Sequence, residues 1–214
     1  MTHTAWSRNE IAQLIAADIP EGSVVNIGIG MPELVANYLD QEKDILLQSE
    51  NGILGMGPMA TGEEVDEDLV NAGKKPVTLL PGGCFFDHTT SFGMMRGGHL
   101  DFAILGGFQV SETGDLANWS TGEPGAIPAV GGAMDLAVGA KQVFVMMEML
   151  TKQGKSKLVE RCTYPLTGLA CVKRVYTDLA VFDVLPSGFS VRAMAPGMTL
   201  TRLQELGGLV FGHA

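Results

Sequence analysis

The sequence predicts an α/β fold in which a single open sheet, mixed but mostly parallel, is flanked by helices and followed by a C-terminal antiparallel hairpin. Short apolar segments of strand length alternate with segments of helical periodicity, which is the pattern of βαβ units. Glycines cluster without a period after several of these strands, as in turns that contact a ligand. The 214 residues contain no linker, repeat or low-complexity tract, so we expect one domain over residues 1–214.

The first elements are predicted from caps and apolar spacing. Ser7 and Glu10 are placed for a capping box, and isoleucine and leucine then recur at helical spacing, so a helix begins here. A strand at 23–27 enters a glycine turn, after which Pro32 suits the first position of another helix. The next strand is predicted at 45–47, parallel to the first.

Later elements are predicted from the same periodicity and from the turns that bound it. Among these turns, the one at Asn118 and Trp119 is a candidate for lining a pocket, although a tryptophan more often packs in a core. The later elements are strands at 77–80, 102–105 and 142–147, a helix over 87–95, an antiparallel hairpin of 179–185 with 189–194, and a last helix from near Thr201.

The strand at 45–47 leads into Ser49, Glu50 and Asn51, and then into residues 52–58, which contain three glycines and end in proline. Ligands of open α/β folds bind at the carboxyl edge of the sheet, so we expect Glu50 to lie over a cleft. Ser49 and Asn51 would orient it or polarise a bound carbonyl, and the glycines would let backbone N–H groups approach a ligand. Such a carboxylate serves as a nucleophile or a proton carrier. The local pattern is equally typical of a polar turn.

Two glycine-rich turns lead into predicted helices and offer backbone donors to an anionic or carbonyl oxygen. The first contains Gly28 and Gly30, but Glu33 stands where a dinucleotide-binding fingerprint requires its third glycine, so no NAD site is predicted. The second spans residues 130–136.

The charge of the chain restricts its ligands. The formal net charge of −10 would repel nucleic acid and anionic membrane surfaces, so an anionic substrate needs local positive charge. Lys74 and Lys75 follow the Glu50 region and are candidates. A second basic segment, which is either a solvated face or faces the anionic end of a ligand or an acidic partner, contains Lys152, Lys155, Lys157 and Arg161.

No metal site is predicted, because the acidic stretch 63–68 lacks EF-hand spacing and His88 and His99 are isolated. The three cysteines have no CxxC spacing and indicate reduced thiols in a cytoplasmic protein. No apolar run reaches membrane-spanning length.

Several longer motifs resemble those of the class I coenzyme A transferases, and specifically their B (beta) subunit. Residues 49–58 are similar to the Ser-Glu-Asn-Gly signature of this family. Further similar motifs follow in the family's order over nearly the whole chain, at 26–32, 71–74, 95–99, 114–119, 131–136 and 165–168.

The resemblance implies that Glu50 attacks an acyl-CoA thioester, forms an acyl-glutamyl anhydride, and then carries CoA as a glutamyl thioester. It also implies that Lys74 meets an anionic part of the complex, and it calls for no metal or organic cofactor. The residues that the resemblance assigns to substrate or CoA binding are Asn26, Gly28, Gly30, Asn51, Lys74, Gly132 and Ala133.

The resemblance further implies a partner. The family's A (alpha) subunit carries a Gly-Gly-Phe-Gly loop for CoA, which neither 91–93 nor 106–109 supplies, so we expect a complex of two alpha and two beta subunits in the cytoplasm. Residues 120–132, together with 162–165 and 176–180, resemble subunits that transfer CoA from succinyl-CoA to 3-oxoadipate. Acetoacetate is the alternative 3-oxoacid acceptor.

Two functions of other classes are alternatives. A non-catalytic scaffold subunit would leave Glu50 unmodified by acyl-CoA. A sugar-phosphate isomerase on a similar fold would use Glu50 as a general base, and it would bind phosphate without forming a thioester.

Overall fold

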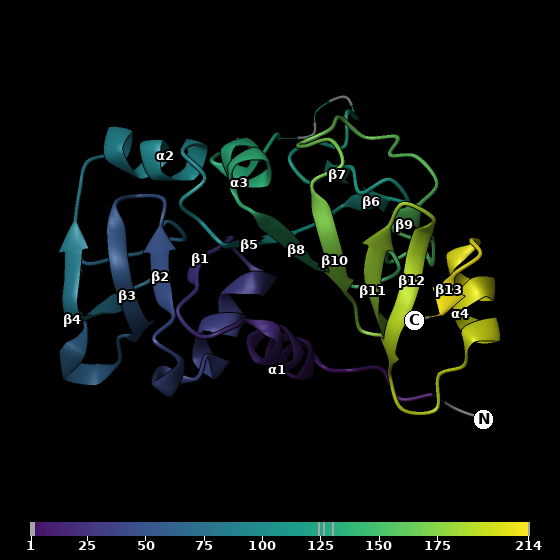
Figure 1. Ribbon diagram of the computed structural model, residues 1–214, viewed down its shortest axis with the longest axis horizontal. Coiled ribbons are helices and arrows are strands. Elements are labelled where there is room, and N and C mark those ends of the chain that lie inside the picture. Colours follow the sequence, from purple (N-terminus) through teal and green to yellow (C-terminus); the bar gives the residue numbers. More distant parts are fainter. Residues whose placement is uncertain (1–2, 124, 126, 130, 214) are drawn as a thin grey trace.

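The computed structural model describes residues 3–123, 125, 127–129 and 131–213. Within them a ten-stranded sheet has the order β13-β12-β11-β10-β8-β5-β1-β2-β3-β4, and a three-stranded sheet has the order β7-β6-β9 (Figure 1). The strands are β1 Val24–Ile27, β2 Leu46–Ser49, β3 Ile53–Met59, β4 Val77–Phe85, β5 Phe102–Gly106, β6 Gln109–Ser111, β7 Leu116–Ala117, β8 Gln142–Met146, β9 Leu158–Val159, β10 Val172–Tyr176, β11 Ala180–Leu185, β12 Gly188–Met194 and β13 Gly212–His213. The helices are α1 Arg8–Asp18, α2 His88–Arg96, α3 Ala133–Gly139 and α4 Leu200–Gly207, with 3-10 helices η1 Met31–Tyr38, η2 Gln41–Lys43 and η3 Gly62–Glu64.

The centre of the large sheet is parallel. Strands β10, β8, β5, β1 and β2 run in one direction, and Val25 of β1 lies opposite Leu47 of β2 and Phe102 of β5. Antiparallel pairs flank this centre: β2-β3-β4 on one side and β10-β11-β12 on the other, where β11 and β12 form the expected hairpin. The prediction of a mixed α/β sheet flanked by helices is therefore confirmed.

Two hydrophobic cores cover the two faces of the sheet. Because side chains alternate along a strand, Ala103 and Leu105 of β5 pack in one core with α2 and α3, whereas Phe102 and Ile104 pack in the other with α1 and η1. Figure 1 shows α2 and α3 on one side of the sheet and α1 on the other. The carboxyl ends of the parallel strands lie between these two layers.

Local sequence signals correctly predict the beginning of α1. The Ser7 side chain accepts a hydrogen bond from the backbone N–H of Glu10, and the Glu10 carboxylate accepts one from the backbone N–H of Ser7 at 2.7 Å. The second helix begins at Met31, so Pro32 lies in its first turn but not at its first position, and the helix winds as the 3-10 helix η1.

The glycine-rich stretch after Glu50 differs from the prediction. Instead of an open ligand-binding turn, residues 53–59 form β3, which pairs with β2 and with β4. Only Gly52 makes the tight turn. It has a φ of 113°, and a Cβ there would collide with the Phe86 carbonyl. Strand β4 also continues past residues 81–83, where the sequence predicts its end.

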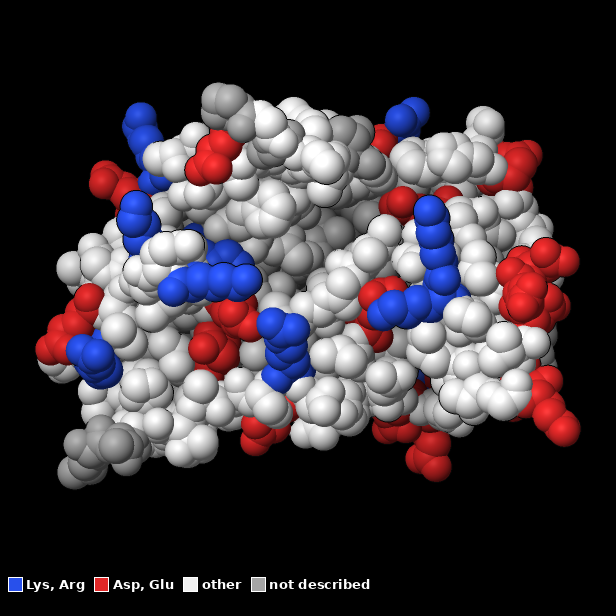
Figure 2. Space-filling view, turned by 180° about the vertical axis from the view of Figure 1, so that it is seen from behind, with Lys and Arg blue, Asp and Glu red and all other residues white. Residues whose placement is uncertain are grey.

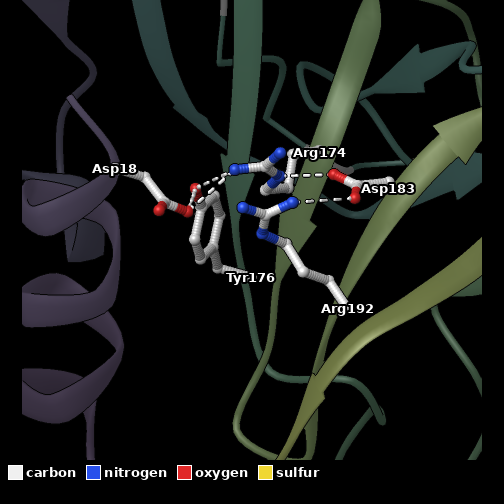
Figure 3. Close-up of polar contacts among 5 residues, drawn as sticks. All are labelled: Asp18, Arg174, Tyr176, Asp183 and Arg192. Atoms are coloured by element: carbon white, nitrogen blue, oxygen red, sulfur yellow. Dashed lines mark hydrogen bonds and ion pairs between the residues drawn. The ribbon is translucent and has the colours of Figure 1, made fainter. Parts of the chain in front are cut away.

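A network of charged side chains joins α1 to the second half of the sheet (Figure 3). Arg174 on β10 pairs with Asp18 at the end of α1 at 2.8 Å and with Asp183 on β11 at 2.5 Å. The Tyr176 hydroxyl donates to Asp18 at 2.7 Å, and burial raises the pKa of this tyrosine. Arg192 on β12 also reaches Asp183. The network therefore fixes α1 against three consecutive strands.

The surface charge is dispersed on the face that Figure 2 shows. Lys and Arg side chains there lie singly or in small groups among acidic and uncharged residues, so this face has no extended basic patch of the kind that binds nucleic acid. Among the helices of the described residues, none is long and apolar enough to cross a membrane.

Candidate active site

Glu50 lies immediately after β2, at the carboxyl end of the parallel centre of the sheet. It lines a cavity of about 520 Å³ that the ends of β1, β5 and β8 and the start of α3 enclose. The position follows from the pairing of β2 with β1, because this pairing places the first residue beyond β2 at the ligand-binding edge. The expectation that Glu50 lies over a cleft is confirmed.

The carboxylate of Glu50 lies against the backbone of Gly132, which directly precedes α3. Burial raises the pKa of Glu50, and Asp135 raises it further, whereas the backbone N–H of Gly132 and the nearby His88 lower it. A Cβ at position 132 would collide with the Glu50 carboxylate, so glycine is required for this approach. The site therefore holds a partly desolvated carboxylate against a backbone donor.

The backbone of Glu50 is held by a chain of buried side chains from three elements. Ser91 Oγ, on α2, donates to the Glu50 carbonyl oxygen at 2.7 Å and accepts from Gln48 Nε2 at 2.8 Å. Gln48 Oε1 in turn accepts from Asn26 Nδ2 on β1 at 2.5 Å. All three side chains are buried. Each hydrogen bond is donated in the direction of Glu50, from Asn26 to Gln48, from Gln48 to Ser91, and from Ser91 to Glu50. Together these bonds fix the peptide plane that follows Glu50, the candidate nucleophile.

Sequence reasoning did not single out Gln48 or Ser91. The available signal was a glutamine inside an apolar strand, since a buried amide requires partners. The partner Ser91 is 43 residues away, so the pairing depends on how α2 packs against the sheet.

Five of the predicted site residues line the cavity: Asn26, Gly28, Glu50, Gly132 and Ala133. Both Nδ2 hydrogens of Asn26 are used inside the protein, since Nδ2 also donates to the backbone carbonyl of Gln48 at 3.1 Å. The N–H of Gly28 donates to the Ile104 carbonyl at 2.8 Å. These polar groups of Asn26 and Gly28 are therefore used within the protein, and the two residues shape the wall of the cavity.

The other predicted residues lie outside the cavity lining. The N–H of Gly30 donates to Glu33, and the Asn51 amide donates to the Val70 carbonyl at 2.8 Å. Lys74 is exposed and has a φ of 60°. The expected contacts of Gly30, Asn51 and Lys74 with a ligand remain predictions.

Two residues from later in the chain complete the wall, and both are among the sequence-based candidates for ligand contact. Asn118, which follows β7, lines the cavity and donates to the Gly106 carbonyl at 3.0 Å. Lys157 also lines it, whereas Lys152 and Lys155 of the same basic segment are exposed. Trp119 is not part of the lining, and its indole N–H donates to the Leu166 carbonyl.

The described residues contain no group of three or more His, Cys, Asp or Glu side chains that could hold a metal ion. His88 instead stacks on Phe92, with ring centroids 4.3 Å apart. The three cysteines are free, and burial raises the pKa of Cys162 and Cys171 to about 11, so these two thiols are poor nucleophiles at neutral pH.

The fold agrees with the family that comparison of sequences shows. The family model described as Coenzyme A transferase matches residues 8–206, so the chain belongs to the coenzyme A transferase family. A relative in Pseudomonas putida KT2440, named as the B (beta) subunit of 3-oxoadipate CoA-transferase, is 64% identical over 203 residues, which are 95% of each chain. A relative of the same name in Acinetobacter baylyi is 55% identical over 208 residues, or 97% of this chain and 96% of the relative.

A solved structure shares the fold. The acyl-CoA transferase YdiF from Escherichia coli O157:H7, as the apoenzyme, superposes with a TM-score of 0.75 at 20% sequence identity. The match covers 100% of this chain but only 43% of the YdiF chain. The present chain thus corresponds to less than half of that longer one.

Proposed function

We propose that the chain is the beta subunit of a transferase that moves CoA from succinyl-CoA to 3-oxoadipate, with Glu50 as the covalent carrier. The observation that carries the proposal is a partly buried carboxylate that lies against the backbone of Gly132 on the wall of a cavity. The names of the two relatives supply the acceptor.

The proposed reaction has two half-reactions. The Glu50 carboxylate attacks the thioester carbonyl of succinyl-CoA and expels the CoA thiolate, which leaves a succinyl-glutamyl anhydride. The thiolate then attacks the glutamyl carbonyl and releases succinate, so Glu50 carries CoA as a thioester. A carboxylate of the acceptor reverses both steps and leaves as a CoA thioester. Each step breaks one acyl bond and forms another, thioester for anhydride or anhydride for thioester, with a thiolate or a carboxylate as the leaving group, and no metal or organic cofactor is required.

The surroundings of Glu50 suit both steps. Burial raises its pKa, which makes the ionised carboxylate a stronger nucleophile than an exposed one. The N–H of Gly132 is placed to stabilise negative charge on the glutamyl oxygen while the thiolate attacks, and one such donor is worth about 3 kcal/mol.

A partner subunit is part of the proposal. Both relatives are named as beta subunits, and the matched YdiF chain is more than twice as long as the part that this chain covers. We therefore propose that an alpha subunit completes the CoA site, that the assembly contains two copies of each subunit, and that it works in the cytoplasm.

The test is covalent trapping. The chain is co-expressed with its alpha subunit, incubated with succinyl-CoA, reduced with borohydride and mapped by mass spectrometry, with Glu50→Gln as the matched variant. We expect a reduced side chain at position 50 in the parent complex and an unreduced one in the variant. An unmodified Glu50 in an assembled complex would refute the carrier mechanism and favour a scaffold or an isomerase.

The acceptor is tested separately. Comparison of kcat/KM for 3-oxoadipate and acetoacetate, with succinyl-CoA as the donor, is expected to favour 3-oxoadipate. A preference for acetoacetate would retain the mechanism and change the substrate.

A further inference from the structure

The cavity that contains Glu50 is lined by only one other ionisable residue among those described, Lys157. The rest of the lining consists of apolar side chains, glycine backbone and the amides of Asn26 and Asn118. One acidic and one basic residue, Glu50 and Lys157, therefore line the same cavity of about 520 Å³.

The backbone of Lys157 is fixed on both sides. Its N–H donates to the Met149 carbonyl at 2.9 Å, and its carbonyl accepts from the N–H of Val110 at 3.0 Å, so β6 and the segment after β8 hold it. Lys157 is only partly exposed, whereas Lys155, two residues earlier, is exposed in the turn that Thr151 closes. The lysine at the cavity wall is therefore held by β-sheet hydrogen bonds.

The ammonium group of Lys157 has no carboxylate within 4.0 Å among the described residues, although Lys75 and Lys141 each pair with one. Glu148 and Asp178 are the two acids whose charges act on Lys157, and each already has another partner. Glu148 pairs with Arg8 at 2.7 Å, and Asp178 accepts from the Met149 N–H at 2.8 Å. Burial lowers the pKa of Lys157, while these two acids oppose the shift. A partly desolvated cation without a close partner favours an anionic ligand.

We infer that Lys157 binds the second carboxylate of a dicarboxylate substrate while the first carboxylate reacts at Glu50. The inference rests on the proposed function and identifies the group that recognises the acceptor. Succinate and 3-oxoadipate both retain a free carboxylate when the other is joined to CoA, and acetoacetate does not. Before loading, the ionised Glu50 repels the free carboxylate of the donor, and the net charge of −10 opposes the entry of donor and acceptor alike, so Lys157 supplies the local positive charge.

The test follows the logic of a double-mutant cycle, in which one change is made in the substrate and the other in the protein. The complex with the alpha subunit is loaded with CoA at Glu50, freed of donor, and mixed with succinate or with succinamate, in which an amide replaces one carboxylate. The dependence of the single-turnover rate on acceptor concentration is measured. We expect the parent complex to prefer succinate about 10- to 100-fold, the range of a charge-assisted hydrogen bond. We expect Lys157→Met to lose this preference, because both acceptors then meet an uncharged wall.

The controls separate charge from folding. Lys155→Met, which removes an exposed charge from the same segment, is expected to keep the parent preference, and Lys157→Arg to keep most of it. The inference is wrong if Lys157→Met still prefers succinate, or if the parent complex does not distinguish the two acceptors. The second outcome needs no variant, so it holds even if Lys157→Met fails to assemble.

Failure of the inference is distinguishable from failure of the proposed function. If the proposed function is wrong, the parent complex acquires no CoA at Glu50, and titration calorimetry of the unloaded complex with succinate and succinamate then tests the anion site directly. If only the inference is wrong, Glu50 is loaded normally and the succinate preference does not depend on Lys157.

Discussion

Ser91 Oγ lies 2.7 Å from the backbone carbonyl oxygen of Glu50 and donates a hydrogen bond to it. The two residues come from different elements, since Ser91 belongs to α2 and Glu50 follows β2. The bond couples the position of a helix to the orientation of the proposed nucleophile.

We predict that Ser91→Ala slows loading of CoA onto Glu50 about 10- to 100-fold, because it leaves the Glu50 carbonyl and Gln48 Nε2 without their partner, a loss of about 1–3 kcal/mol. Rapid-quench measurement of thioester formation per assembled complex checks this. Thr89→Ala, an exposed change on the same helix, is the control. A loading rate equal to that of the parent would show that Ser91 is only structural.

We predict that Gln48→Met also slows the loading of CoA onto Glu50. It removes the amide between Asn26 and Ser91 but keeps the length of the side chain, so two buried polar groups lose a partner. If the chain of bonds acts as a unit, the combined effect of Gln48→Met and Ser91→Ala will be smaller than the sum of the two single effects. Additive effects on loading would contradict this coupling.

Gly132→Ala is predicted to abolish loading while the protein still folds. The backbone at 132, with φ −69° and ψ 0°, accepts alanine, but the new Cβ would collide with the Glu50 carboxylate. Gly131→Ala is the matched control, because a Cβ there would lie 3.9 Å from Glu50 Oε1, an ordinary contact. Circular dichroism and trapping with succinyl-CoA measure the two properties. Efficient loading in Gly132→Ala would contradict the described approach.

The raised pKa of Glu50 predicts a pH dependence of both rate and stability. Loading requires the ionised carboxylate, so its rate will rise with pH through a value above the ordinary glutamate pKa of 4.5. A raised pKa in the folded state means that the stability contribution is complete below the unfolded pKa and is lost as pH rises through the folded pKa. Glu50→Gln should therefore raise the melting temperature at pH 7 and much less at pH 4. Equal shifts at the two pH values would refute this.

Arg174→Met is predicted to destabilise the protein by about 3 kcal/mol, because it leaves Asp18 and Asp183 without their main cation. Arg202→Met, which breaks an exposed pair within α4, is expected to cost less than about 1 kcal/mol. Urea unfolding of both variants measures the difference. Similar losses would mean that the Arg174 network is no stronger than a surface pair.

Local patterns predict those parts of the fold that depend on neighbours in sequence. Ser7 and Glu10 are three residues apart and cap α1 as expected, and Glu50 follows its strand directly. The strand over residues 53–59 was not predicted, because their glycine content is typical of a turn and the strand pairs with β4, whose residues lie 18 to 32 positions later. Periodicity contains no information about such a partner.

The candidate site was predictable to a similar degree. Glu50 and Gly132 belong to motifs that can be recognised locally, whereas the Ser91 bond depends on the packing of α2 against the sheet. In the sequence, Lys157 is only one of several basic residues. Its place at the cavity wall follows from the pairing of β9 with β6, which residues distant in sequence determine.

Glu50 contacts two different helices: its carbonyl accepts a hydrogen bond from Ser91 of α2, and its carboxylate packs against Gly132, the residue that precedes α3. The two helices are joined by the Arg96–Asp135 pair at 2.6 Å, and Gly139 of α3 lies so close to α2 that a Cβ would collide with the Met95 carbonyl. The orientation of the Glu50 carboxylate therefore depends on the distance between α2 and α3. A change of packing at Gly139, at the far end of α3, would therefore reach the proposed nucleophile without touching it.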